Sequence, residues 1–308
     1  MRKGLCKIGY TRIIQLESVF FMDRFVTERN QTGIISVSGK TKEWHMKYVL
    51  VTGAYGGMGR SVVESLCAKG YHVFALDRQV GEAQENVTPV CADITDVGSI
   101  ENAYQMISAV TQDLYAILHF AGIYMLDSLV EISPEKLHRM FMVNVLGAMQ
   151  INQVFMPMLG SGSRILMTTS ELAPLDPLPF TGLYAVAKGA LDKYAYSLRM
   201  ELQLLSIQVS VLRAGAVQTG MLGVSTDALQ QFVKNTQLYQ CNASRFKKIV
   251  DTVEARHIPP SKLAKKAMQI LHKKKPKFAY AINRNPLLRL FGWLPRWLQF
   301  WIIRMILK

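Results

Sequence analysis

A regular alternation of short apolar runs with longer segments of helical periodicity constrains the fold of this chain more than any other feature. It begins at Met46 and continues to Ile282. The runs with the length and composition of buried strands are 48–51, 71–76, 88–91, 114–120, 164–169, 207–212 and 278–282. Helical segments such as 60–69, 134–159 and 184–205 separate them. This alternation predicts βαβ units, and therefore a parallel sheet with helices on both faces.

Composition limits the class of protein. A length of 308 residues suits one large domain. Half of the residues are hydrophobic and 19% are charged, and this composition argues against a disordered chain. The four cysteines are scattered and match no zinc or disulfide pattern; they are Cys6, Cys67, Cys91 and Cys241. We therefore expect reduced thiols and a cytoplasmic protein.

The net charge of +14 is concentrated near the carboxyl end. Residues 255–308 contain 13 Lys and Arg and no Asp or Glu, which leaves the rest of the chain with 23 basic and 22 acidic residues. Such a stretch is either a solvated basic face or a surface that meets anionic lipid or an anionic substrate. Because no aromatic-basic platform or recognition motif accompanies it, we expect no nucleic-acid partner.

The two ends of the chain depart from the alternating pattern. Residues 1–45 predict a dispensable extension before a catalytic domain at 46–285, within which 216–258 predicts a loop and short helices. Residues 286–308 are rich in Trp, Leu and Ile, but interrupting Arg, Gly and Pro residues argue against a spanning helix. This amphipathic segment predicts a hairpin packed on the domain or a helix on a membrane surface.

Three tryptophans of this segment are spaced by four residues. Trp293, Trp297 and Trp301 would then share one helical face, and an indole with its polar N–H suits a bilayer interface. The alternative is that they cover the core of the domain or a subunit interface. For this cytoplasmic protein, the sequence leaves open whether it is peripheral to a membrane and whether it forms a homo-oligomer.

A glycine-rich turn at 52–59 lies directly between the first strand and a helix. Glycines permit a tight turn and let the backbone approach a pyrophosphate at the positive helix N-terminus. Asp77 ends the second strand, where a carboxylate can accept hydrogen bonds from the ribose hydroxyls of NAD. It would repel the 2′-phosphate of NADP, whereas Arg78 could hold that phosphate. The sequence favours NAD and leaves NADP open.

Tyr184 and Lys188 are four residues apart in a predicted helix and so share one face. A tyrosine with a pKa of about 10 is a poor base at neutral pH. We expect a neighbouring ammonium and a positive nicotinamide to lower that pKa. The pair follows a strand that ends in Ser170, at the sheet edge where such folds place their sites.

In their order and spacing these features resemble the short-chain dehydrogenase/reductase family. The resemblance spans roughly 46–285 and is carried by the glycine-rich turn, Asp77, Asp93-Ile94, Ala121-Gly122, Asn144, Ser170 and Tyr184-x-x-x-Lys188. It implies an α/β fold with a Rossmann-type, doubly wound sheet of seven parallel strands in a single domain. It also implies an NAD(P)-dependent oxidoreductase that interconverts an alcohol and its carbonyl.

The resemblance assigns roles to individual residues. Ser170 would bind the substrate oxygen, Tyr184 would transfer the proton, and Lys188 would bind the nicotinamide ribose and tune Tyr184. Asn144 would hold a water that completes a proton relay. The residues implied in cofactor binding are Gly53, Tyr55, Gly57, Met58, Gly59, Asp77, Arg78, Asp93, Ile94, Ala121, Gly122, Tyr184, Lys188, Val217 and Thr219. We expect no metal.

The chain departs from the family pattern at a few positions. His119-Phe120 replaces a common Asn-Asn before Ala121-Gly122, which puts the usual hydrogen bonds from sheet to site in doubt, and Ala214 replaces a common Pro. We expect His119 to be a satisfied buried histidine rather than a base. Glu171 is expected to be structural or to face solvent.

A looser resemblance concerns the substrate. The segment 177–180, the insertion up to Ile258 and the basic Trp-rich end resemble the branch with hydroxysteroid dehydrogenases, retinol dehydrogenases and acyl-dihydroxyacetone-phosphate reductases. This branch implies a bulky apolar alcohol or ketone and a lid at 220–258. The alternatives are a non-catalytic dinucleotide-binding regulator, against which the complete catalytic set argues, and a sugar-nucleotide epimerase or dehydratase, against which the lack of a separate substrate domain argues.

Overall fold

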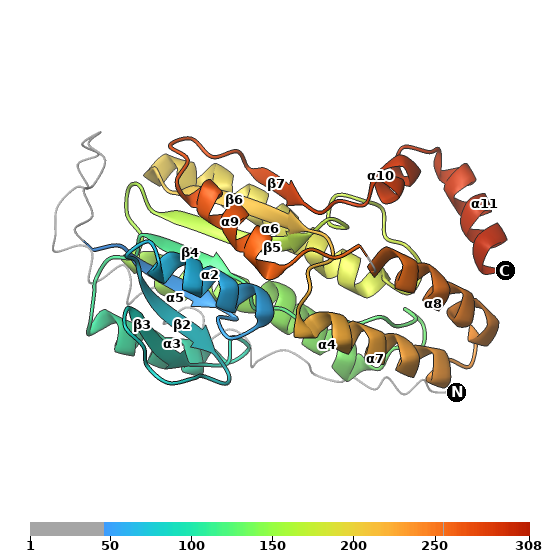
Figure 1. The fold of residues 1–308 in the computed structure, drawn as a ribbon, viewed down its shortest axis with the longest axis horizontal. Helices are drawn as coiled ribbons and strands as arrows, with labels where there is room; N and C mark the ends of the chain where they lie inside the picture. Colours follow the sequence, from blue (N-terminus) through green and yellow to red (C-terminus); the bar gives the residue numbers. More distant parts are fainter. Residues whose placement is uncertain (1–45, 255) are drawn as a thin grey trace, which may run out of the picture. The chain divides into compact units, whose positions relative to one another are not determined.

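In the computed structural model, seven parallel strands form one sheet in the order β3-β2-β1-β4-β5-β6-β7 (Figure 1). Their bounds are Tyr48–Thr52 (β1), His72–Asp77 (β2), Val87–Cys91 (β3), Ala116–His119 (β4), Arg164–Ser170 (β5), Gln208–Ala214 (β6) and Ala279–Ile282 (β7). The chain runs outward from β1 to β3 and then returns to pair β4 with β1. Ligands bind beyond the carboxyl ends of strands at such a switch point. All seven expected strands are confirmed.

The structure describes residues 46–254 and 256–308, except for the side chains of 220–227 and 252–254. These residues fall within one compact unit. The predicted extension at 1–45 lies outside the described residues. Its dispensability, and the domain boundaries at 46 and 285, stay predictions.

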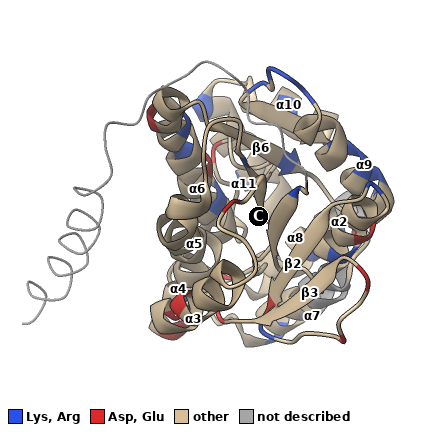
Figure 2. Ribbon diagram, turned by 90° about the vertical axis from the view of Figure 1, so that its left-hand side faces the viewer, with Lys and Arg blue, Asp and Glu red and all other residues tan. Residues whose placement is uncertain are grey.

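Helices cover both faces of the sheet, as Figure 2 shows nearly end-on. They are α2 (Gly57–Cys67), α3 (Val97–Ser108), α4 (Pro134–Phe141), α5 (Gly147–Phe155), α6 (Gly182–Leu202), α7 (Gly220–Asn235), α8 (Gln240–Glu254), α9 (Pro260–Leu271), α10 (Pro286–Gly292) and α11 (Arg296–Leu307). Helices α2 and α9 pack on one face, and α3, α5 and α6 pack on the other. The doubly wound architecture is therefore confirmed.

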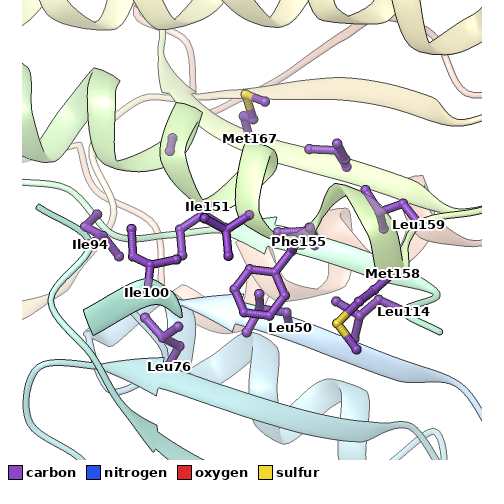
Figure 3. Packing of buried hydrophobic residues seen from close by; sticks show 14 of the residues in the cluster. Leu50, Leu76, Ile94, Ile100, Leu114, Ile151, Phe155, Met158, Leu159 and Met167 are labelled. Carbon is purple, nitrogen blue, oxygen red and sulfur yellow. The ribbon is translucent and has the colours of Figure 1, made fainter. Parts of the chain in front are cut away.

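The two cores follow from the alternation of side chains along each strand. Leu50 of β1 belongs to the core beneath α3, α5 and α6, whereas its neighbours Val49 and Val51 belong to the core beneath α2 and α9. Figure 3 shows Ile151 and Phe155 of α5 in the first core. Because both faces are buried, the strands read as nearly continuous apolar runs in the sequence.

The segment predicted as one helix at 134–159 is interrupted. A π-helical segment, Met142–Leu146, separates α4 from α5, and Asn144 lies in the middle of it. Such interruptions are frequent at functional sites. The periodicity of the sequence does not reveal the break, because apolar residues continue through it.

The expectation of a loop and short helices between 216 and 258 was wrong. Helices α7 and α8 have 16 and 15 residues, and they build a third small core. Its buried members are Leu126, Phe180, Leu229, Phe232, Ala243, Phe246, Val250 and Leu307. Because this core forms from segments distant in the sequence, local periodicity alone could not predict it.

The carboxyl end forms two helices rather than one continuous face. Helix α10 ends at Gly292 and α11 begins at Arg296, after Pro295, so Trp293 does not share a helical face with Trp297 and Trp301. Helix α11 packs against α8. Among the described residues, none of the helices has both the length and the hydrophobicity that a membrane span requires.

Candidate active site

A cleft of ≈ 800 Å³ opens at the carboxyl edge of the sheet. Twelve of the residues expected to bind a cofactor line it: Gly53, Tyr55, Gly57, Met58, Gly59, Asp77, Arg78, Asp93, Ile94, Ala121, Gly122 and Thr219. The other three, Tyr184, Lys188 and Val217, line an adjoining pocket. The fold thus brings the whole expected set to one edge of the sheet.

Glycine is required at Gly53, in the turn that precedes α2, and at Gly59, in the first turn of α2. Gly53 has a φ of 67°, and a Cβ on it would lie 2.4 Å from the Ala121 backbone nitrogen. A Cβ on Gly59 would lie 2.0 Å from the Gly53 carbonyl oxygen. One on Gly57 would lie 2.7 Å from the Thr219 Cβ. No side chain caps the N-terminus of α2, so its first N–H groups suit a pyrophosphate.

Asp77 is fixed at the end of β2. Its carboxylate accepts hydrogen bonds from the backbone N–H groups of Tyr55, at 3.1 Å, and Arg78, at 2.8 Å. This places an acceptor on the wall of the cleft, where a ribose would lie. Arg139 of α4 also lines the cleft. The sequence does not reveal this residue, because nothing in a helix sequence shows which turn faces a cleft.

Asp93 caps the turn that leads into α3. Its Oδ1 accepts hydrogen bonds from the Thr95 backbone N–H at 2.9 Å and from the Thr95 hydroxyl at 2.8 Å. Burial raises the pKa of Asp93, but the hydrogen bonds from Thr95 and the charges of Arg78 and Arg139 outweigh it and lower the pKa. Asp93 is therefore a carboxylate at neutral pH.

Ser170 and Tyr184 meet where the cleft joins the adjoining pocket. Ser170 is the last residue of β5, and Tyr184 is the third residue of α6. Both side chains line this pocket, and Ser170 lies near enough to Tyr184 to oppose part of the rise in its pKa. The Tyr184 ring packs edge-on against Tyr124, with ring centroids 4.6 Å apart. Two hydroxyls placed side by side in this way can both contact one oxygen atom of a small molecule.

Lys188 lies one helical turn beyond Tyr184 and is buried. Its Nζ donates to the Thr168 carbonyl at 3.2 Å, and burial lowers the pKa of this lysine to about 8. A Cβ on Gly122 would lie 3.3 Å from Lys188 Nζ and 2.9 Å from Asn144 Oδ1. Gly122 thus leaves the space that both side chains need.

Asn144 is held by the loop that follows β4. Its Oδ1 accepts from the Ile123 backbone N–H at 2.9 Å, and its Nδ2 donates to the Ile123 carbonyl at 2.8 Å. The amide therefore fixes the loop that borders both pockets. That Asn144 also holds a water stays a prediction.

The pKa of Tyr184 does not follow the expectation from the sequence. Burial raises it to about 12, and the nearby Ser170 side chain opposes this shift only in part. Lys188 was expected to lower this pKa, but its ammonium is directed at the Thr168 carbonyl. The protein groups alone therefore keep Tyr184 protonated, which suits a proton donor.

The glycine-rich turn, the β1–β4 switch point and the Ser170–Tyr184–Lys188 group agree with a comparison of sequences. A model of the short chain dehydrogenase family matches residues 47–230, more than half of the chain. The chain belongs to this family. The match confirms the expected family.

Several relatives and structures of this family are similar to the chain. Estradiol 17-beta-dehydrogenase 2 of Mus musculus is 29% identical over 211 residues, which cover 62% of this chain and 55% of the mouse protein. The NADPH-dependent 3-dehydrocapnine reductase of Ornithobacterium rhinotracheale is 26% identical over 257 residues, or 79% of this chain and 90% of that protein. A short chain dehydrogenase family protein from Francisella tularensis matches with a TM-score of 0.65 at 24% identity, covering 77% of this chain and 97% of the other. The chain spans about half the length of the mouse relative.

The departures from the family pattern are accommodated by the structure. His119 is buried, and its Nε2 lies 2.9 Å from Asn152 Oδ1. Burial lowers the pKa of His119 to about 4, so the ring is neutral and Nε2 carries the hydrogen that Asn152 accepts. Asn152 in turn donates to the Tyr194 hydroxyl at 3.2 Å. The expectation of a satisfied buried histidine is confirmed.

Glu171 has a structural role and does not face open solvent. Its Oε2 accepts from the Asn285 backbone N–H at 2.6 Å, which ties β5 to the segment before α10. Burial raises the pKa of Glu171, although the Asn285 N–H and the nearby Arg284 oppose the shift. The same side chain also lines the pocket beside Tyr184.

That pocket has a volume of ≈ 210 Å³ and is mainly apolar. Beyond the polar residues at Ser170 and Tyr184, its wall includes Leu172, Leu178, Phe246, Ile249, Val250 and Leu288. A lid at 220–258 was expected, but the sequence does not show which of its side chains line the pocket. It also does not show that Leu288 of α10 does so. Their inward direction depends on packing between α8, α10 and the sheet.

Proposed function

We propose that this protein is an NAD(P)-dependent oxidoreductase that interconverts a bulky apolar alcohol and its carbonyl. The observation that supports this most is that Ser170, Tyr184 and Lys188 line one pocket together, with Lys188 one helical turn beyond Tyr184. The three side chains lie where a dinucleotide-sized cleft meets an apolar pocket. A non-catalytic regulator would have no need for this arrangement at the junction of two cavities.

We infer a task for each side chain from its position. The substrate oxygen would lie between the two hydroxyls, where Ser170 donates a hydrogen bond to it. Tyr184, which burial keeps protonated, gives its proton to a carbonyl oxygen in reduction and takes it back in oxidation. Lys188 and Asp77 would bind the two riboses of the dinucleotide. A bound NAD(P) supplies or accepts the hydride and, when oxidised, adds positive charge beside Tyr184.

The pocket wall supports a bulky apolar substrate. Aliphatic and aromatic side chains make up most of it, including four from α8 and α10, and Glu171 is the one acidic group among its lining residues. The mouse relative is named for estradiol, a molecule of this chemical class. A cytoplasmic location, contact with a membrane surface through 286–308 and assembly into a homo-oligomer complete the proposal.

A panel of steroid, retinoid and long-chain ketones, assayed with NADH and with NADPH, tests this function. We expect turnover with at least one apolar ketone. Tyr184→Phe should lower kcat by about 100-fold or more with nearly unchanged nucleotide affinity, because only the phenol oxygen carries the proton. Tyr196→Phe, on an exposed position of the same helix, serves as the control. Nucleotide binding without any turnover would favour the regulator, and turnover of Tyr184→Phe within about tenfold of the unmodified protein would exclude the assigned role.

A further inference from the structure

Helices α10 and α11 present an exposed apolar surface that no described part of the chain covers. Its members are Leu287, Leu290, Trp293, Trp297, Phe300 and Trp301, each between 57% and 73% exposed. We call these six residues the tryptophan face. It holds three of the four tryptophans of the chain. Exposed apolar clusters of this size on folded proteins mark sites of interaction.

The exposure does not arise from loose attachment of α11. On its inner side Leu307 is buried in the third core, and Ile303 packs against the same core. The Leu307 carbonyl accepts a hydrogen bond from Asn242 Nδ2 of α8 at 2.6 Å. Gln299 is buried and donates to the Leu294 carbonyl at 2.8 Å. The domain therefore holds this helix by one side and leaves its aromatic side outward.

The charged side chains of α10, α11 and the residues next to them are all basic, although Asp176 pairs with one of them. From residue 284 to 308 the chain carries Arg284, Arg289, Arg296, Arg304 and Lys308 and no acidic residue. Arg289 lies over the Trp293 ring at 5.2 Å, and Arg296 is 3.5 Å from Asp176 in an exposed pair. A second copy of this surface would bring like charges together, whereas an anionic lipid surface offers opposite charge and an apolar interior.

Most of the remaining basic residues near the carboxyl end are elsewhere. Figure 2 shows Lys and Arg along α9 and on the loop that follows it. This loop, with Lys273, Lys274, Lys275 and Lys277, precedes β7 and so lies at the amino edge of the sheet. Helix α10 follows β7 at the carboxyl edge. The attraction to a lipid surface at the tryptophan face must come from its own few arginines and Lys308.

The apolar pocket reaches the surface beside this face. Leu288 of α10 lines the pocket, while its neighbour Leu287 belongs to the tryptophan face. On the facing helix, Ile249 lines the pocket and is also 39% exposed. The opening is therefore bordered by α8 and α10, and Figure 1 shows both at the same end of the sheet as α11.

We propose that the tryptophan face seats the protein on an anionic lipid bilayer, with the pocket opening toward the lipid. Indole rings lie at the interface, and arginines contact the headgroups. An apolar substrate dissolved in the bilayer then reaches Tyr184 without crossing water. Binding of the tryptophan face to the bilayer does not depend on any activity of the protein. Delivery of a substrate from the bilayer to Tyr184 rests on the proposed function.

Co-sedimentation of the full chain with phosphatidylcholine vesicles, with and without phosphatidylglycerol, tests the seating. We expect binding to the anionic vesicles that weakens as salt rises. The double variant Trp297→Ser/Trp301→Ser should bind at least about tenfold more weakly. The control is Leu204→Ser, which removes an equally exposed apolar side chain at the opposite edge of the sheet. It should bind as the unmodified protein does, and equal nucleotide affinity of all three shows that each is folded.

Two further measurements separate the alternatives. Tryptophan emission should shift to shorter wavelength on the anionic vesicles, and brominated lipid should quench it. Tyr184→Phe should bind vesicles fully, so failure of catalysis and failure of seating are distinguishable. Equal partitioning of the unmodified protein and the double variant, or no partitioning of either, would overturn the proposal. A dimer in gel filtration that the double variant converts to monomer, with no vesicle binding, would assign the face to a second copy instead.

Discussion

Asp192, which is buried, and Arg213, which is partly buried, form an ion pair in which the guanidinium donates to both carboxylate oxygens, Nε to Oδ1 at 2.9 Å and Nη2 to Oδ2 at 2.6 Å. The pair joins α6 to β6. The Thr169 hydroxyl also donates to Asp192 Oδ1, at 3.2 Å. Because Thr169 precedes Ser170 and Asp192 lies one turn beyond Lys188, this cluster fixes the helix that carries Tyr184 against the strand that carries Ser170.

Asp192→Asn should therefore destabilise the protein. The change leaves the partly buried Arg213 without its counter-charge, which costs less than the about 3–5 kcal/mol of a fully buried pair, on the order of 2 kcal/mol. Urea unfolding measures the loss. Glu64→Gln, which removes an exposed partner of Arg60, should change stability by less than about 1 kcal/mol. Similar effects of the two changes would show that the pair of Asp192 with Arg213 is not structurally important.

Gly122→Ala should reduce turnover much more than it reduces stability. The added methyl group would lie 2.9 Å from Asn144 Oδ1 and 3.3 Å from Lys188 Nζ, so it would displace both. We expect kcat to fall by about tenfold or more, as small displacements in a site often cause. Gly160→Ala is the control, because a Cβ there meets no atom within 4 Å. Unchanged kcat in Gly122→Ala would mean that the site has room to relax.

Asp77→Ala should shift the cofactor preference from NAD toward NADP. The change removes the carboxylate that would accept from a ribose and repel a 2′-phosphate. We expect the ratio of kcat/KM for NADP over NAD to rise by about tenfold or more, since hydrogen bonds to charged groups contribute about 1.5–3 kcal/mol. Arg78→Ala should shift the ratio in the opposite direction. If the unmodified enzyme prefers NADP, Arg78 becomes the determinant of cofactor choice.

Lys188→Met should stabilise the protein at neutral pH, and the gain should fade as the pH rises. Burial lowers the pKa of Lys188 from 10.5 to about 8, so below pH 8 the folded state carries a disfavoured ammonium. Between about pH 8 and 10.5 the folded chain has lost this proton while the unfolded chain still holds it, and stability rises with pH. Urea unfolding at about pH 7 and about pH 10 measures the difference. Lys193→Met, at an exposed position of α6, is the control, and a pH-independent gain for Lys188→Met would contradict the prediction.

The sheet and the main polar groups of the site were predictable, for identifiable reasons. Strands buried on both faces leave continuous apolar runs, so all seven could be found. Gly53 is demanded by its positive φ and Gly59 by a backbone contact with Gly53, while Tyr184 and Lys188 are recognised by the spacing of one helical turn. Each of these constraints is local, and the sequence displays it.

The features of the fold and the site that could not be predicted depend on contacts between segments that are distant in the sequence. The π-helical segment around Asn144, the ion pair of Asp192 with Arg213, and the inward direction of Arg139 and Phe246 all require the fold to be known. The pKa of Tyr184 was expected to fall through the combined effect of Lys188 and a positive nicotinamide. The protein groups alone raise it, because burial dominates and the Lys188 ammonium is directed at the Thr168 carbonyl.

Contact between Thr219 and the glycine-rich turn has a consequence for kinetics. Thr219 directly precedes α7, and its side chain lies against Gly57, at the start of α2. The segment that begins there continues into α8, which forms a wall of the apolar pocket. Residues of one stretch of chain thus border both the cleft and the pocket, and we expect an opening movement of that stretch to release both ligands. Substitutions that speed the departure of the nucleotide should then also speed the departure of the product.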